Sequence, residues 1–197
     1  MATSTRPRAD AARNRERLVT AARELMNSDP RVPLEKIAAA AGVGIGTLYR
    51  NFPSRDSLLE AAYRQHADEM TDLVQKLVAD AVAPAEAMRR VIVHYMATSG
   101  QKAGLKEAIV ASAGTGAEIF QDTAARSSAA IGTLLAAGQA DGTFRTDVEA
   151  EDVRRLIGGL CAMCQRSEPA ECACGCGADP CNGRLVGVVL DGLRPHA

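Results

Sequence analysis

Six cysteines, all within the last 37 residues, are the side chains with the clearest capacity for chemistry; they are Cys161, Cys164, Cys172, Cys174, Cys176 and Cys181. Residues 172–181 read CACGCGADPC, and Gly175 and Gly177 between the thiols permit tight turns. Cys161 and Cys164 are spaced i, i+3 and therefore share one helix face. Because clustered thiolates favour soft or borderline ions, the segment is predicted to bind Zn²⁺, Cu⁺, Cd²⁺, Hg²⁺ or arsenite.

Four interpretations of these cysteines stay open. The thiols could sense a metal or metalloid ion, or hold a structural metal at a subunit interface. They could instead form disulfides as a redox switch. They could also be incidental, with Cys161 and Cys164 as ordinary core residues. The spacing is not that of a standard zinc finger, so the cofactor remains unknown.

A second motif lies in the first third of the chain, where residues 42–58 read GVGIGTLYRNFPSRDSL. A short helix, a glycine-containing turn and a second short helix form the helix-turn-helix pattern, whose second helix enters the major groove. Thr47, Tyr49 and Asn51 carry hydrogen-bonding tips that suit phosphate oxygens. Arg50 is long enough to reach a phosphate or a guanine edge.

This segment closely resembles the TetR family of bacterial transcriptional regulators, through Gly42, Val43, Thr47, Leu48, Tyr49, Phe52, Arg55 and Leu58. Weaker resemblance extends over residues 15–41, 142–145 and 190–195. It implies a homodimer that binds double-stranded operator DNA and represses until an effector releases it. It also implies that Tyr49 and Arg55 contact the DNA backbone. Arg55 begins a helix, where its charge opposes the helix dipole, so a nearby phosphate would explain it.

Two glycines are unusual for the recognition helix, the second helix of the motif. Gly44 and Gly46 lie at or inside its start, where each costs about 1 kcal/mol relative to alanine in a helix interior. Neither offers a side chain to read a base. We therefore expect sparse direct readout, with more of the specificity carried by Arg50, by Arg6 and Arg8 of the N-terminal arm, and by DNA shape. Alternatively, Gly44 is simply a tolerated cap.

The resemblance places an effector pocket inside the C-terminal bundle. Candidate effector-binding residues are Met88, His94, Tyr95 and Phe120, although such side chains at helical spacing are also typical of a core. The dimer would form through helices 149–165 and 184–193, which carry apolar faces.

Apolar positions recur at helical spacing along the chain, and no strand pattern appears. The predicted fold is all-α with about nine helices, and Gly100 is expected to separate two of them. The expected helices span residues 10–28, 34–41, 45–51, 55–82, 84–99, 101–113, 117–140, 149–165 and 184–193. The expected organisation is a flexible basic arm (1–9), a DNA-binding domain (10–54), and an effector-binding and dimerisation domain (55–197) with a Cys-rich loop (166–183).

The charge distribution agrees with a polyanion partner for the first third. The net charge of the 197-residue chain is −1. Residues 1–66 hold eleven Lys and Arg against seven Asp and Glu, and residues 67–197 hold twelve against seventeen. No apolar run approaches the roughly 18 residues of a membrane span. We expect a cytoplasmic protein with no membrane partner and mostly reduced cysteines.

An enzyme is the first rival, but the sequence has no nucleophile elbow, phosphate loop or paired-carboxylate motif, so no catalytic residue is predicted. The second is a metal-binding protein without sequence-specific DNA binding. The third is a repressor that responds to an apolar organic ligand.

Overall fold

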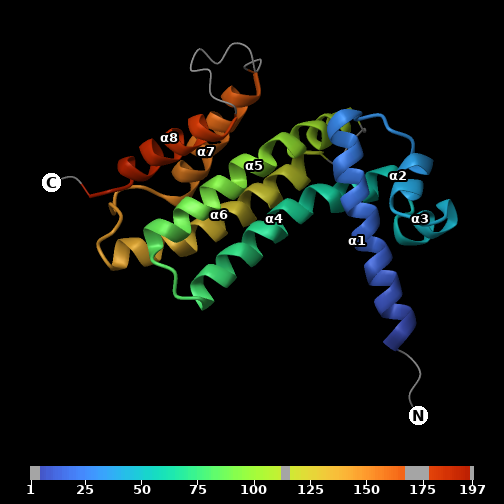
Figure 1. Cartoon of the computed structure of the whole chain (residues 1–197), viewed down its shortest axis with the longest axis horizontal. Helices are drawn as coiled ribbons and strands as arrows, with labels where there is room; N and C mark the ends of the chain where they lie inside the picture. The colour runs from blue at the N-terminus through green and yellow to red at the C-terminus, as the bar shows by residue number, and fades with distance from the viewer. Residues whose placement is uncertain (1–4, 112–115, 167–177, 196–197) are drawn as a thin grey trace. The chain divides into compact units, whose positions relative to one another are not determined.

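The computed structural model describes residues 5–111, 116–166 and 178–195, and within these ranges every regular element is an α-helix (Figure 1). The predicted all-α fold is therefore confirmed. Eight helices lie in the described ranges: α1 (Thr5–Ser28), α2 (Leu34–Ala40), α3 (Ile45–Asn51), α4 (Arg55–Ala79), α5 (Pro84–Ala111), α6 (Gly116–Ala140), α7 (Ala150–Arg166) and α8 (Ala178–Gly192).

The chain divides into two compact units. The first comprises Met1–His66 and Gln101–Gln121, so it extends beyond the expected 10–54 domain to include the first turns of α4 and parts of α5 and α6. Its core gathers one apolar face from each of these helices. Its largest fully buried side chains are Leu18, Met26, Ile37, Leu48, Phe52, Leu58, Leu59 and Leu105.

The second unit comprises Ala67–Gly100 and Asp122–Ala197. Its core is built from the remaining parts of α4, α5 and α6 together with α7 and α8. Among its most deeply buried side chains are Met70, Met88, Val91, Ile92, Ile131 and Ile157. None of the helices in the described ranges is long and apolar enough to cross a membrane.

Three helix boundaries differ most from those expected. Helix α1 begins at Thr5 rather than near residue 10, and Pro7 is compatible with this start because it falls in the first turn, where the backbone N–H has no intrahelical acceptor. Helix α5 runs unbroken past Gly100. One glycine costs only about 1 kcal/mol, and apolar burial on both sides of it outweighs that cost. Helix α8 begins at Ala178, inside the expected 166–183 loop, again with a proline, Pro180, in its first turn.

Candidate nucleic-acid interface

The turn between α2 and α3 depends on Gly42. Its φ of +65° lies in the left-handed region, where a side chain would be strained. A Cβ at this position would also overlap the guanidinium of Arg17 on α1. The turn is closed by a hydrogen bond of 2.9 Å from the Val43 N–H to the Ala38 carbonyl. The glycine therefore fixes how α3 leaves α2.

Helix α3 is held by its buried side and by α1. Leu48 and Phe52 are almost fully buried in the first core. The guanidinium of Arg15, on α1, stacks 4.3 Å from the centroid of the Phe52 ring. The same side chain donates a 3.2 Å hydrogen bond to the Asn51 carbonyl, at the end of α3. These contacts leave the opposite face of α3 as the exposed one.

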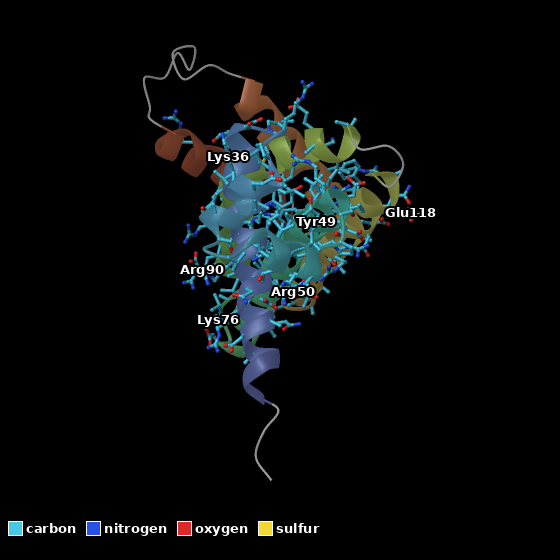
Figure 2. All side chains as sticks on the ribbon, turned by 90° about the vertical axis from the view of Figure 1, so that its right-hand side faces the viewer. Lys36, Tyr49, Arg50, Lys76, Arg90 and Glu118 are labelled. Atoms are coloured by element: carbon cyan, nitrogen blue, oxygen red, sulfur yellow. The ribbon has the colours of Figure 1, made fainter. Side chains whose placement is uncertain are left out.

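That exposed face carries four of the seven predicted DNA-binding residues. Gly44, Gly46, Tyr49 and Arg50 are exposed, and the Tyr49 side chain is 48% accessible. Figure 2 shows Tyr49 and Arg50 on the outer side of the helix-turn-helix, with Lys36 of α2 also displayed. Among the residues that the structure describes, no atom beyond the adjacent backbone lies within 4 Å of a Cβ built on Gly44 or Gly46, so the packing of these residues does not require either glycine.

Thr47 and Asn51 are half-buried and bond within α3. The Asn51 amide donates to the Thr47 carbonyl at 2.8 Å, which satisfies the end of the helix. Arg50 folds back along the same helix, where it donates to the Gly46 carbonyl at 3.2 Å and to the Thr47 hydroxyl at 3.0 Å. These Arg50 bonds are exposed, so breaking them to reach a ligand costs little.

Arg55 has a different environment from the one expected. Its guanidinium is half-buried and donates to the carbonyl oxygens of Val32 at 2.6 Å and Pro30 at 2.7 Å, in the segment between α1 and α2. Two carbonyl acceptors therefore account for a cation at a helix start without any phosphate. Helix α4 is also capped, by reciprocal bonds between Ser54 and Ser57.

Sequence reasoning did not single out Lys36 and Arg15. Lys36 is an exposed cation on α2, and Arg15 orders the end of α3. The excess of basic residues in the first third was the only sequence signal for either.

The four candidate effector-binding residues lie in both units. Met88 is fully buried in the second core, and Tyr95 packs at its edge. His94 is half-buried on the same helix. Phe120 belongs to the first unit, where its ring meets Tyr63 edge to face at 5.1 Å.

Tyr95 lies beside a polar network on α7. Burial raises the pKa of the Tyr95 phenol, and Cys161 adds to the rise, while Arg154 opposes it. Glu151 accepts hydrogen bonds from Arg154 at 2.5 Å and from the Ser128 hydroxyl at 2.7 Å. These bonds hold the pKa of Glu151 at about 2, below its ordinary value of 4.5.

Of the six cysteines, the structure describes the surroundings of Cys161 alone, which is buried in the second core. The backbones of Cys164 and Cys181 belong to α7 and α8, but their side chains fall outside the described part. Cys172, Cys174 and Cys176 lie wholly outside the described residues. Within the described residues, no cluster of three or more potential metal ligands occurs.

Two short helices, α2 and α3, joined by a turn at Gly42 and with α3 exposed, form the helix-turn-helix of a DNA-binding regulator. Comparison with known proteins identifies the family. Residues 18–62 match the model for bacterial regulatory proteins of the tetR family. Residues 83–195 match the model described as the C-terminal domain of SbtR-like transcriptional regulators. The chain therefore belongs to the TetR family of transcriptional regulators.

Two solved structures are similar over nearly the whole chain. The TetR transcriptional regulator SCO0520 from Streptomyces coelicolor is 36% identical, with a TM-score of 0.72 over 93% of this chain and 99% of that one. A TetR regulatory protein from Mycobacterium vanbaalenii is 31% identical, with a TM-score of 0.74 over 95% and 99%. The HTH-type transcriptional regulator SAR0097 of Staphylococcus aureus is 32% identical over 76 residues, which cover 37% of this chain and 40% of that protein.

Proposed function

We propose that this regulator is a homodimeric repressor that binds operator DNA through α3 and is released by an effector bound to its C-terminal half. The observation that supports it best is that Tyr49 and Arg50 are exposed on α3 and lie outside the hydrophobic core of the first unit. Lys36 adds a cation on α2.

Gly44 and Gly46 support a close approach of DNA to this surface. Because no described residue of the first unit fills the space around them, their lack of a side chain suits an external partner better than internal packing. A backbone without Cβ atoms lets phosphates or base edges come near. Arg50, once released from its helix, would reach a phosphate or guanine. For Arg55 we infer that it positions the α1–α2 segment rather than contacting DNA.

Exposed apolar residues on α7 and α8 support the homodimer. Leu156 on α7 is 51% accessible and Val188 on α8 is 69% accessible. Gly159 and Gly187 lie on the same helices with open space around their Cβ positions, which allows close approach of another helix. In a two-fold dimer this face would pack against the same face of the second copy. Two reading helices would then meet successive half-sites on the DNA.

For the inducer, the Cys-rich segment favours a thiophilic metal or metalloid ion, and the apolar second core supports an organic ligand as the alternative. A metal or metalloid inducer is inferred from the number and spacing of the cysteines in the sequence. A ligand can act as an inducer only if it binds the free and DNA-bound conformations unequally.

Fluorescence anisotropy with DNA from upstream of the coding region tests the DNA-binding surface. Arg50→Gln should weaken specific binding by about 5- to 150-fold, the effect of removing one base or phosphate contact. Arg90→Gln is the matched control, because Arg90 is also an exposed arginine, paired with Glu86 on α5. Equal losses in both variants, or none in Arg50→Gln, would contradict the assignment.

The inducer is tested on the same DNA with the reduced protein and Zn²⁺, Cu⁺, Cd²⁺ or arsenite. Release by one ion, reversed by a chelator or competing thiol and lost when Cys172, Cys174 and Cys176 become serine, supports metal sensing. Release that survives the triple substitution refutes it. Binding that no ion alters would favour the organic ligand.

A further inference from the structure

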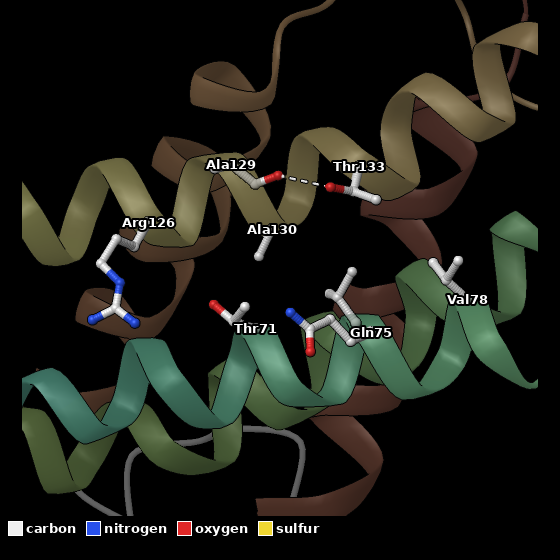
Figure 3. Close-up of a pocket in the computed structure, with 8 residues that line it drawn as sticks. Thr71, Gln75, Val78, Arg126, Ala129, Ala130 and Thr133 are labelled. Atoms are coloured by element: carbon white, nitrogen blue, oxygen red, sulfur yellow. Dashed lines mark hydrogen bonds between the residues drawn. The ribbon is translucent and has the colours of Figure 1, made fainter.

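A groove of about 370 Å³ lies within the second unit between α4 and α6. Figure 3 shows Thr71 of α4 directed towards α6 and Ala130 of α6 directed towards α4, with the Gln75 side chain lying along α4. Its volume falls in the range of small-molecule sites, about 300–1,000 Å³. The residues that line it are Thr71, Val74, Gln75, Val78, Arg126, Ala129, Ala130 and Thr133. None of the candidate effector-binding residues on α5 is among them.

The two threonine hydroxyls of the groove can accept hydrogen bonds from a ligand but have no proton left to donate. The Thr71 hydroxyl donates its proton to the Ala67 carbonyl at 2.8 Å, and the Thr133 hydroxyl donates to the Ala129 carbonyl at 3.2 Å. Each hydroxyl has a single proton, so both oxygens face a ligand as acceptors. The Gln75 amide adds both a donor and an acceptor.

The charge in the groove is already balanced. Arg126, at one end, forms an ion pair with Asp68 of α4. A ligand carboxylate would have to approach a guanidinium whose neighbour is already a carboxylate, and like charges repel. A ligand cation would meet the guanidinium itself. An uncharged molecule avoids both costs.

The floor of the groove is apolar. Val74 and Ala130 are buried beneath it, and Val78 at the far end is 53% accessible. From Thr71 to Val78 the seven-residue step along α4 is about 10 Å at 1.5 Å per residue. That length matches one aromatic ring with a short alkyl chain.

Because the groove combines a hydroxyl acceptor, a paired charge and an apolar floor, we propose that it binds an uncharged molecule of the alkylphenol class, with a hydroxyl or N–H donor and an apolar body. The donor bonds to the Thr71 oxygen, and the apolar part covers Val74, Ala130 and Val78. A hydrocarbon of the same shape would bury the threonine oxygen without a partner, which is unfavourable. The site requires no assumption about DNA binding, and it is tested without DNA.

The test is isothermal titration calorimetry of the full-length chain with 4-propylphenol, 4-propylanisole and 4-propylbenzoate. The phenol should bind saturably, one per chain. The anisole, which lacks the donor, should bind about fivefold more weakly, the effect of one hydrogen bond. The benzoate should bind more weakly than the phenol.

Variants locate the binding. Thr71→Val, which keeps the shape and removes the acceptor, should weaken phenol binding about fivefold. Ala129→Leu should weaken it at least tenfold, because it fills the groove from an exposed helix position that tolerates leucine. Thr98→Val is the matched control, since the Thr98 hydroxyl also donates to its own helix, at 2.9 Å to the His94 carbonyl, but lies outside the groove. Circular dichroism melts establish that each variant is folded.

Binding of the phenol with the expected order of ligands and variants supports the site. Any of four results overturns it: no saturable phenol binding, anisole or benzoate binding as tightly as the phenol, unchanged affinity in Ala129→Leu, or an equal loss in Thr98→Val and Thr71→Val. Failure here leaves the DNA-binding proposal untouched, because that proposal is measured on DNA with substitutions in α3.

Discussion

Removing the Arg55 guanidinium tests whether this residue is a structural anchor. Its two hydrogen bonds, at 2.6 and 2.7 Å to the Val32 and Pro30 carbonyls, hold the segment between α1 and α2. A hydrogen bond from a charged donor contributes about 1.5–3 kcal/mol. Because the site is half-buried and water can replace part of the interaction, Arg55→Met should lower the free energy of unfolding by about 2–4 kcal/mol. Arg55→Lys, which cannot span both carbonyls, should lose roughly half of that.

Two measurements distinguish this role from a phosphate contact. Urea denaturation followed by circular dichroism gives the stability of each variant. The salt dependence of operator affinity gives the number of phosphates neutralised, and loss of one contact lowers the slope of log K against log salt by about one. An anchor predicts lost stability with an unchanged slope. A slope reduced by about one in Arg55→Met, with stability unchanged, would refute the anchoring role.

Three further predictions concern the second unit. Gly138→Ala should destabilise the fold by about 1–3 kcal/mol in urea denaturation, because its Cβ would overlap the buried Phe144 ring. Gly132→Ala on the same helix, where the nearest atom of another helix is 3.4 Å from the new Cβ, is the control and should not destabilise the fold; equal losses would exclude overlap with Phe144 as the cause. Leu156→Glu should shift sedimentation from dimer to monomer, and an unchanged dimer would exclude this face of α7. Because folding lowers the pKa of Glu151 from 4.5 to about 2, the stability it contributes is present above about pH 4.5 and is lost as the pH falls towards 2. The difference in melting temperature between wild type and Glu151→Gln should therefore be constant above pH 5 and shrink below it; a difference that grows there would be inconsistent.

The helix-turn-helix could be predicted from sequence because its determinants are local. Gly42 supplies the one backbone conformation that the turn needs, and Leu48 and Phe52 mark the buried side of α3 by their spacing. The capping of α4 by Ser54 and Ser57 is likewise a short-range pattern.

The environment of Arg55 could not be predicted in the same way. Its partners are backbone carbonyls 23 and 25 residues away, and a carbonyl has no side chain to mark it in a sequence. The unbroken α5 is a related case. Local propensity favours a break at Gly100, but burial of distant residues on both sides decides the outcome. The α4–α6 groove also arises only when two separate helices pack.

DNA binding by a dimer through α3 is tested most directly by selecting DNA with the full-length chain from a random library, then sequencing the selected DNA and measuring binding to it. We expect an inverted repeat whose half-sites lie one helical turn, about 10 base pairs, or a multiple of it apart. We also expect that Arg50→Gln weakens binding to the site, whereas Arg90→Gln does not. Enrichment of no sequence, or of a single unrepeated element bound equally well by Arg50→Gln, would contradict a dimeric operator-binding regulator that reads DNA through α3.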